Sequence, residues 1–359
     1  MSHVLLVGNA LEQLHTLPSE SVDCIVTSPP YWGLRDYGVS GQIGLEPTLQ
    51  EFLSNLGEVF AECHRVLKPT GNLWVNMGDS YATNAGNANR AGGGTQGKEF
   101  KGPNTQPNRL KAAHGLAPKN LIGQPWRLAF ALQDAGWILR RDIIWHKPSP
   151  MPESVKDRCT TAHEYIFHFV KSGRYYYNGD AIREPAKESS MARLSQDVEN
   201  QEGSSRANAG GKTNGKMKAV ARTPQGWAQS DKYADRDPRY PKRDLGDPKI
   251  HAGSAEGIED RKHVYLTANA RSVWTFPTAG YSGAHFATFP EELPRRCILA
   301  GCPEGGTVLD PFAGSGTTLA VAKKLGRKSI GIDLNPDYAQ IIRERMDGIT
   351  ESLFLEDAS

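Results

Sequence analysis

The chain has 359 residues, a length that suits one large domain core carrying an insertion. A core of this size needs neither disulfides nor a structural metal for stability. Lysine and arginine number 42 and aspartate and glutamate 40, so the net charge of +2 neither favours nor excludes nucleic acid as a partner. No segment approaches the roughly 18 apolar residues of a membrane span, and we expect no membrane partner.

The N-terminus and the cysteines both favour a cytoplasmic protein. Residues 1–8 lack the basic leader and the long apolar run of a secretory signal. The five cysteines are an odd number and contain no Cys-x-x-Cys pair for zinc or thiol redox chemistry. We therefore expect buried free thiols in a reducing compartment.

Strand and helix patterns alternate along both ends of the chain. In chain order they predict strand 4–7, helix 10–17, strand 23–27, helix 49–67, strand 72–77, helix 121–132, and strands 137–145 and 163–170. The alternation resumes after Arg271, with two strands that end at Asp310 and Asp333 and are each followed by a helix. This order predicts an α/β fold.

Two polar regions interrupt the alternation. Residues 80–120 are rich in glycine and asparagine and carry six basic side chains against one acidic side chain. A loop this long is uncommon in a compact domain, and both a nucleic-acid-facing loop and a plain disordered insertion fit it. The second region, about 178–269, includes five basic residues and no acidic residue within 206–222. Such runs are usually solvated surface, so charge alone identifies no partner.

The segment 307–333 has the pattern of a nucleoside site. A strand ending at Asp310 leads into a turn with Gly314 and Gly316, which lack a Cβ and let the backbone lie against a ligand. The carboxylate of Asp333, at the end of the next strand, can accept both hydroxyls of a ribose. The turn lacks the third glycine of a dinucleotide motif and the Gly-Lys-Ser/Thr of a phosphate-binding loop. We expect a ligand with ribose and adenine and no phosphate.

A second motif, Ser28-Pro29-Pro30-Tyr31, directly follows the strand at 23–27. The Ser28 hydroxyl and the Pro29 carbonyl are two acceptors, and an exocyclic amino group has two N–H bonds to donate. Tyr31 offers a flat face on which a base can stack, for about 1–3 kcal/mol. A proline-stiffened strand end is the alternative, and the presence of the nucleoside pattern elsewhere in the chain disfavours it.

Together the two segments resemble the S-adenosylmethionine-dependent DNA methyltransferases that modify exocyclic amino groups. The catalytic Ser/Asp-Pro-Pro-Tyr motif of that family reads residues 28–31 here, and its Phe-x-Gly-x-Gly cofactor motif reads 312–316. The catalytic motif precedes the cofactor motif, which is the order of the permuted β class. The resemblance extends over nearly the whole chain.

This resemblance implies a Rossmann-like methyltransferase fold, circularly permuted, with a mostly parallel seven-stranded sheet and helices on both faces. Residues 1–178 would form the catalytic half of the core, with the basic loop 80–120. Residues 179–270 would form an inserted target-recognition region, and 271–359 the cofactor-binding half.

The resemblance also assigns site residues. The catalytic residues would be Ser28, Pro29, Pro30 and Tyr31. The residues that bind S-adenosylmethionine would be Asn9, His285, Phe286, Asp310, Phe312, Gly314, Ser315, Gly316, Thr317, Thr318 and Asp333. Relatives often have aspartate where this chain has Asn9. No metal is expected.

Ser28 in the motif favours cytosine N4 as the target, and adenine N6 is the alternative. The base would flip out of double-stranded DNA, at a cost of a few kcal/mol, to reach the site. Methylation at carbon 5 needs a cysteine nucleophile, which in that family lies in a Pro-Cys dipeptide, and no cysteine here follows a proline. A cognate restriction endonuclease is a possible partner, and the chain would be a monomer or homodimer.

Two other classes of function remain open from the sequence. A nicotinamide dehydrogenase would share the glycine turn but would leave residues 28–31 unexplained. A methyltransferase-derived RNA or protein modifier, or a DNA-binding protein without activity, would keep both motifs.

Overall fold

The computed structural model describes residues 2–34, 36, 38–82, 115–186, 267–278 and 289–349. Its contacts divide the chain into two compact units, one formed by 1–182 with 271–359 and the other by 183–270. Most of the loop 80–120, the basic run 206–222, and the predicted site residues His285 and Phe286 lie outside the described residues.

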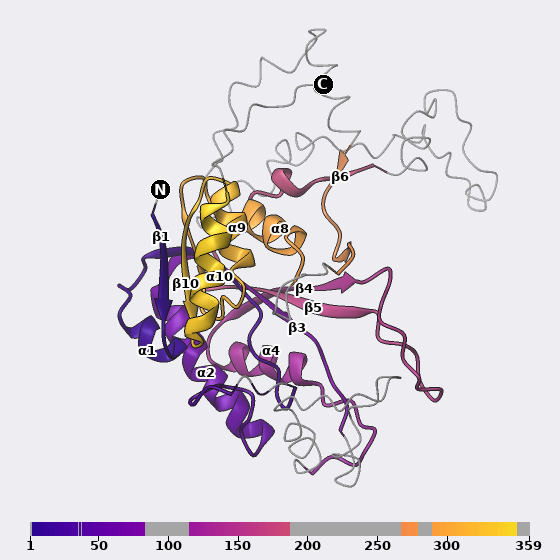
Figure 1. Cartoon of the computed structure of the whole chain (residues 1–359). Helices are drawn as coiled ribbons and strands as arrows, with labels where there is room; N and C mark the ends of the chain where they lie inside the picture. The colour runs from indigo at the N-terminus through magenta and orange to yellow at the C-terminus, as the bar shows by residue number, and fades with distance from the viewer. Residues whose placement is uncertain are drawn as a thin grey trace, which may run out of the picture. The chain divides into compact units, whose positions relative to one another are not determined.

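An eight-stranded sheet forms the centre of the first unit, in the order β1-β10-β9-β2-β3-β5-β4-β8 (Figure 1). The strands are β1 (His3–Val7), β2 (Val22–Thr27), β3 (Leu67–Met77), β4 (Ile138–His146), β5 (His163–Val170), β8 (Val273–Thr275), β9 (Thr307–Asp310) and β10 (Lys328–Asp333). All neighbours pair in parallel except β5, which is antiparallel to both β3 and β4. The predicted mostly parallel sheet is confirmed.

The sheet differs from the expected one by its eighth strand. β8 has three residues and pairs in parallel with the end of β4. A segment this short contains too few side chains to display an alternating pattern, so periodicity could not predict it. β3 also begins earlier than predicted, at Leu67, because backbone pairing with β2 starts there despite Pro69.

Helices cover both faces of the sheet (Figure 1). One layer contains α1 (Ala10–His15), α2 (Leu49–Val66) and α4 (Gln124–Asp134), and the other contains α8 (Glu292–Gly301), α9 (Thr317–Lys324) and α10 (Pro336–Asp347). α2 begins where the Thr48 hydroxyl accepts the backbone N–H of Glu51, and its apolar stripe is buried against the core. None of the helices in the described ranges is long and apolar enough to cross a membrane.

The strand order brings the two sequence motifs together. β9 and β2 are neighbours, but from β9 the chain continues to β10 on one side, whereas from β2 it continues to β3 on the other. The carboxyl ends of parallel strands at such a switch point enclose a crevice where α/β proteins bind ligands. The first strand, β1, pairs in parallel with the last, β10, so the two ends of the described chain meet in one sheet.

The second unit is described only near its two ends. β6 (Glu184–Pro185) and β7 (Thr267–Ala268) form a two-stranded antiparallel sheet. The Arg183 guanidinium donates to the hydroxyl and the carbonyl of Thr267, and so holds these two ends of the unit together.

The packing of β10 against α9 generates a stability prediction. A Cβ at Gly331 would lie 2.6 Å from Leu319 Cδ2 and 3.2 Å from the Ala313 side chain. We expect Gly331→Ala to destabilise the fold by about 1–3 kcal/mol because the core is overpacked there. Urea unfolding measures this, with Gly57→Ala in α2 as the control, since a Cβ at Gly57 meets no atom within 4 Å. An equal effect of both variants would contradict the packing argument.

Candidate active site

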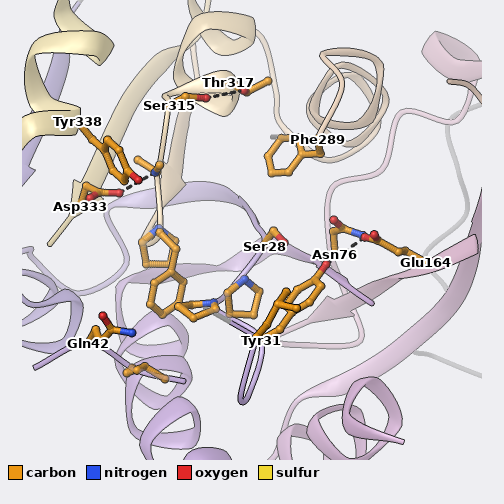
Figure 2. A pocket seen from close by; sticks show the side chains of 18 of the residues that line it. Ser28, Tyr31, Gln42, Asn76, Glu164, Phe289, Ser315, Thr317, Asp333 and Tyr338 are labelled. Carbon is orange, nitrogen blue, oxygen red and sulfur yellow. Dashed lines mark hydrogen bonds between the residues drawn. The ribbon is translucent and has the colours of Figure 1, made fainter. Parts of the chain in front are cut away.

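A cavity of about 660 Å³ opens at the carboxyl ends of β2 and β9. Figure 2 shows Asp333 and Tyr338 on one side of it and Tyr31, Asn76 and Glu164 on the other, with Ser28 between them. Most of the predicted site residues line this cavity: Asn9, Ser28, Pro29, Pro30, Tyr31, Phe312, Gly314, Ser315, Thr317 and Asp333. The catalytic and cofactor motifs, nearly 300 residues apart in the sequence, therefore share one cavity.

The buried carboxylate of Asp310 joins the two motifs through hydrogen bonds. Its carboxylate accepts the hydroxyl of Thr27 at 2.7 Å, the hydroxyl of Thr318 at 2.7 Å and the backbone N–H of Phe312 at 3.1 Å. Burial raises the pKa of Asp310 to about 6, and the three donors oppose that rise. Asp310 is fully buried and is not a lining residue, so its contacts support the site from within the core.

The glycine turn wraps around the carboxylate of Asp333. Gly314 and Gly316 have φ values of 52° and 76°, in the left-handed region that favours glycine. Asp333 Oδ2 accepts the backbone N–H of Gly314 at 2.7 Å, and Oδ1 accepts that of Asn335 at 2.9 Å. Burial raises the pKa of Asp333 to about 6. This carboxylate lines the cavity and, with one bond on each oxygen, keeps further acceptor capacity.

Three predicted residues have supporting roles. Gly316 is the N-cap of α9, and a Cβ there would lie 3.0 Å from Ile342 Cγ1. Thr318 is buried, and its hydroxyl donates a hydrogen bond to Asp310. Asn9 has two roles, because it lines the cavity and its side chain also caps α1 by accepting the backbone N–H of Leu11 at 2.9 Å.

Tyr31 is fixed at both its ring edge and its hydroxyl. The hydroxyl donates to Glu164 Oε2 at 3.0 Å, and the ring lies so close to Gly78 that a Cβ there would approach Tyr31 Cε2 to 3.1 Å. Burial, followed by the neighbouring Glu164, raises the pKa of Tyr31 well above its ordinary value. The phenol is therefore neutral and donates a hydrogen bond to the carboxylate.

Sequence analysis missed a group of lining residues that lie outside both motifs. They are Gln42, Asn76, Trp145, Lys147, Glu164, Phe289 and Tyr338. Tyr338 is close to Asp333 in the sequence and could have been found from that proximity. The others reach the cavity through the tertiary fold, which no local pattern reveals. Among the described residues no group of three or more His, Cys, Asp or Glu side chains could hold a metal ion.

Comparison with known proteins identifies similar sequences over nearly the whole chain. A family model described as DNA methylase, of the N6/N4 methyltransferase type, matches residues 22–344. The chain is 40% identical to the type II methyltransferase M.SmaI of Serratia marcescens over 344 residues, covering 95% of this chain and 90% of that protein. It is 41% identical to the type II methyltransferase M.Cfr9I of Citrobacter freundii, covering 96% of this chain and 87% of that protein.

Two solved structures share the fold. The PvuII DNA methyltransferase, described as cytosine-N4-specific, superposes with a TM-score of 0.55 at 17% identity, covering 98% of this chain and 89% of that one. A putative DNA modification methylase from Thermus thermophilus, complexed with S-adenosyl-L-methionine, superposes with a TM-score of 0.50 at 23% identity, covering 96% and 93%. The Rossmann-like methyltransferase fold is thus confirmed.

The contacts of Asp310 predict a pH-dependent loss of stability in Thr27→Val. At pH 7 the buried carboxylate is ionised and loses one of three donors, so we expect about 1.5–3 kcal/mol of destabilisation. Loss of a donor raises the folded-state pKa of Asp310 in the variant above the wild-type value of about 6, so the destabilisation starts to shrink as the pH falls through that raised value. It is smallest below about pH 6, where the carboxyl is protonated in both proteins.

Urea unfolding at pH 7 and pH 5 measures this difference. Ser21→Ala is the control, because it removes an exposed hydroxyl that donates to the Pro18 carbonyl. A Thr27→Val penalty that is the same at both pH values would contradict a charged Asp310.

Proposed function

The chain belongs to the N6/N4 DNA methylase family, and from this premise we propose that it transfers a methyl group from S-adenosylmethionine to the N4 amino group of a flipped cytosine in double-stranded DNA. One observation carries the proposal: the Ser28-Tyr31 turn and the glycine turn at 312–316 line the same cavity. Membership of this family excludes the nicotinamide dehydrogenase.

The residues of the cavity fit S-adenosylmethionine. Gly314 keeps the turn free of a side chain where a nucleoside would lie, and Asp333 retains acceptor capacity for ribose hydroxyls. Tyr338 and Leu334 add an aromatic and an apolar surface for adenine on the same side. The cavity volume of about 660 Å³ lies in the range of small-molecule sites.

S-adenosylmethionine supplies an electrophilic methyl group: the N–C bond forms as the C–S bond breaks, and the amino nitrogen then releases one proton. The amino nitrogen of cytosine is a poor nucleophile because its lone pair is delocalised into the ring. The Ser28 hydroxyl and the Pro29 carbonyl would accept its two N–H bonds, draw the nitrogen towards sp³ and aim the lone pair. Such alignment can supply about 7–11 kcal/mol of the barrier.

Tyr31 would hold the flipped base. Removal of a base from the duplex costs a few kcal/mol, and stacking on the Tyr31 ring offsets part of that cost. Ser28, in place of the aspartate of the alternative motif, supports cytosine as the target. Adenine N6 is the other outcome that the experiment below distinguishes.

We further propose that residues 179–270 recognise the target sequence and that the basic side chains of 80–120 and 206–222 neutralise DNA phosphates. Binding would then weaken steeply as the salt concentration rises. A restriction endonuclease of the same specificity would be the natural partner, since the relatives M.SmaI and M.Cfr9I are type II methyltransferases.

Sequencing that detects modified bases, applied to DNA from cells that express the chain, tests the proposed function. We expect N4-methylcytosine at one short recurring sequence, and none in cells that express Ser28→Ala. Methylation of adenine would correct the target base. Unmodified DNA, together with label transfer from S-adenosylmethionine to RNA or protein, would refute the proposal.

Two substitutions separate chemistry from cofactor binding. We expect Ser28→Ala and Tyr31→Ala to lower the rate of methyl transfer at least about 100-fold, because each removes a contact to the reacting base. The Kd for S-adenosylmethionine, measured by calorimetry, should stay within about twofold because neither residue is on the Asp333 side of the cavity. Full activity in both variants would refute these roles.

The raised pKa of Asp333 predicts pH-dependent cofactor binding. If ribose hydroxyls need the ionised carboxylate, protonation below its pKa of about 6 should weaken binding about tenfold between pH 7 and pH 5. Asp310 titrates in the same range, so Asp333→Asn is the control and should bind weakly with a flat pH profile. An unchanged pH profile in that variant would assign the titration to another group.

A further inference from the structure

Behind Tyr31 lies a cluster of polar side chains that the mechanism above does not use. Glu164, at the start of β5, accepts the Tyr31 hydroxyl and the Asn76 side-chain N–H on Oε2, at 3.0 and 3.1 Å (Figure 2). Its other oxygen, Oε1, pairs with the Lys147 ammonium. Three donors from three different segments therefore converge on one carboxylate at the cavity wall.

The arrangement does not suit a proton acceptor. Oε2 of Glu164 already accepts two donors and Oε1 accepts the Lys147 ammonium, so a proton from substrate would be added beside a cation. The Glu164 and Lys147 side chains are only 18% and 19% exposed. Breaking a pair that is this far removed from water leaves an uncompensated charge, which is costly. The contacts instead suit a carboxylate that holds its three donors in place.

The other members of the cluster are themselves held. Lys147 lies over the Trp145 ring, 4.6 Å from its centroid, and Asn76 also donates to the backbone carbonyl of Tyr165. The register of the sheet sets these positions, because Trp145 on β4 is directly opposite Glu164 on β5. The carboxylate thus cannot move without disturbing two strands.

We propose that Glu164 is a positioning residue for methyl transfer: its carboxylate, fixed by Lys147 and Asn76, holds the Tyr31 ring in the plane on which the flipped base stacks. This role rests on the proposed function. Gly78 contributes to it, since the absence of a Cβ there lets the Tyr31 ring pack closely: a Cβ would lie only 3.1 Å from Tyr31 Cε2. A ring that is fixed before the base arrives loses little rotamer freedom on binding, so more of the stacking energy holds the base.

A double-mutant cycle tests the role. Tyr31→Phe keeps the ring and removes only the hydroxyl. Glu164→Gln keeps the size of the side chain. In either orientation of the amide, however, its NH₂ group faces a donor that the carboxylate accepts in wild type. The control is Glu20→Gln, which removes a more exposed carboxylate that pairs with Lys171 at 3.4 Å and does not line the cavity. The assay is methyl transfer to a duplex that contains the mapped site.

Each single variant should lower kcat about tenfold, the size expected for loss of one hydrogen bond to a charged group, while Glu20→Gln matches wild type. The double variant should lose clearly less than the hundredfold product of the two single effects, because both changes weaken the contact between Glu164 and the Tyr31 hydroxyl, although Glu164→Gln also alters the contacts with Asn76 and Lys147. The Kd for S-adenosylmethionine should be unchanged. A fluorescent cytosine analogue at the target position, or 2-aminopurine for an adenine target, should have less of its stacked-base signal in the variants than in wild type.

Several results would overturn the role. They are wild-type rates in the single variants, a roughly hundredfold loss in the double variant, or weakened cofactor binding that accompanies the loss of kcat. Complete loss in Glu164→Gln with a wild-type rate in Tyr31→Phe would make Glu164 a proton acceptor. A wild-type chain that transfers no methyl group to any DNA would refute the proposed function itself, and the positioning role with it.

Discussion

The cavity that both motifs line depends on the hydrogen bonds that join Asp310 to Thr27 and Thr318. Thr27 is the last residue of β2, directly before the Ser-Pro-Pro-Tyr turn, and Thr318 lies in the first turn of α9, directly after the glycine turn. A buried carboxylate is costly unless it is hydrogen bonded, so the fold must keep both hydroxyls in place. Because the same contacts span the switch point of the sheet, they also set the distance between the two motifs.

The two sides of the cavity are built differently. On the Asp333 side the backbone of the glycine turn supplies the shape, and the carboxylate organises its N–H groups. On the Tyr31 side, three side chains shape the cavity wall: Asn76 on β3, Glu164 on β5 and Lys147 at the end of β4. The proposed cofactor contacts thus rest on backbone geometry, whereas the proposed contacts to the base rest on side chains that hold one another.

All of the described residues that line the cavity belong to the first compact unit. The region that we propose for target recognition belongs mostly to the second unit, at 183–270. In this proposal chemistry and recognition are encoded in separate parts of the chain. A change of recognition sequence would then not need to alter Asp310, Glu164 or the turns that they hold.

The sequence by itself determined the α/β class, most strands and helices, and both motifs, because strand and helix periods, prolines and glycines act over a few residues. It also placed Asp310 near the ligand, although only the structure assigned it a supporting role below the cavity. The short strand β8 and the contact of Glu164 with Tyr31, 133 positions apart, were decided by tertiary structure alone. Strand pairing selects such partners through the register of the whole sheet, and no local pattern contains that information.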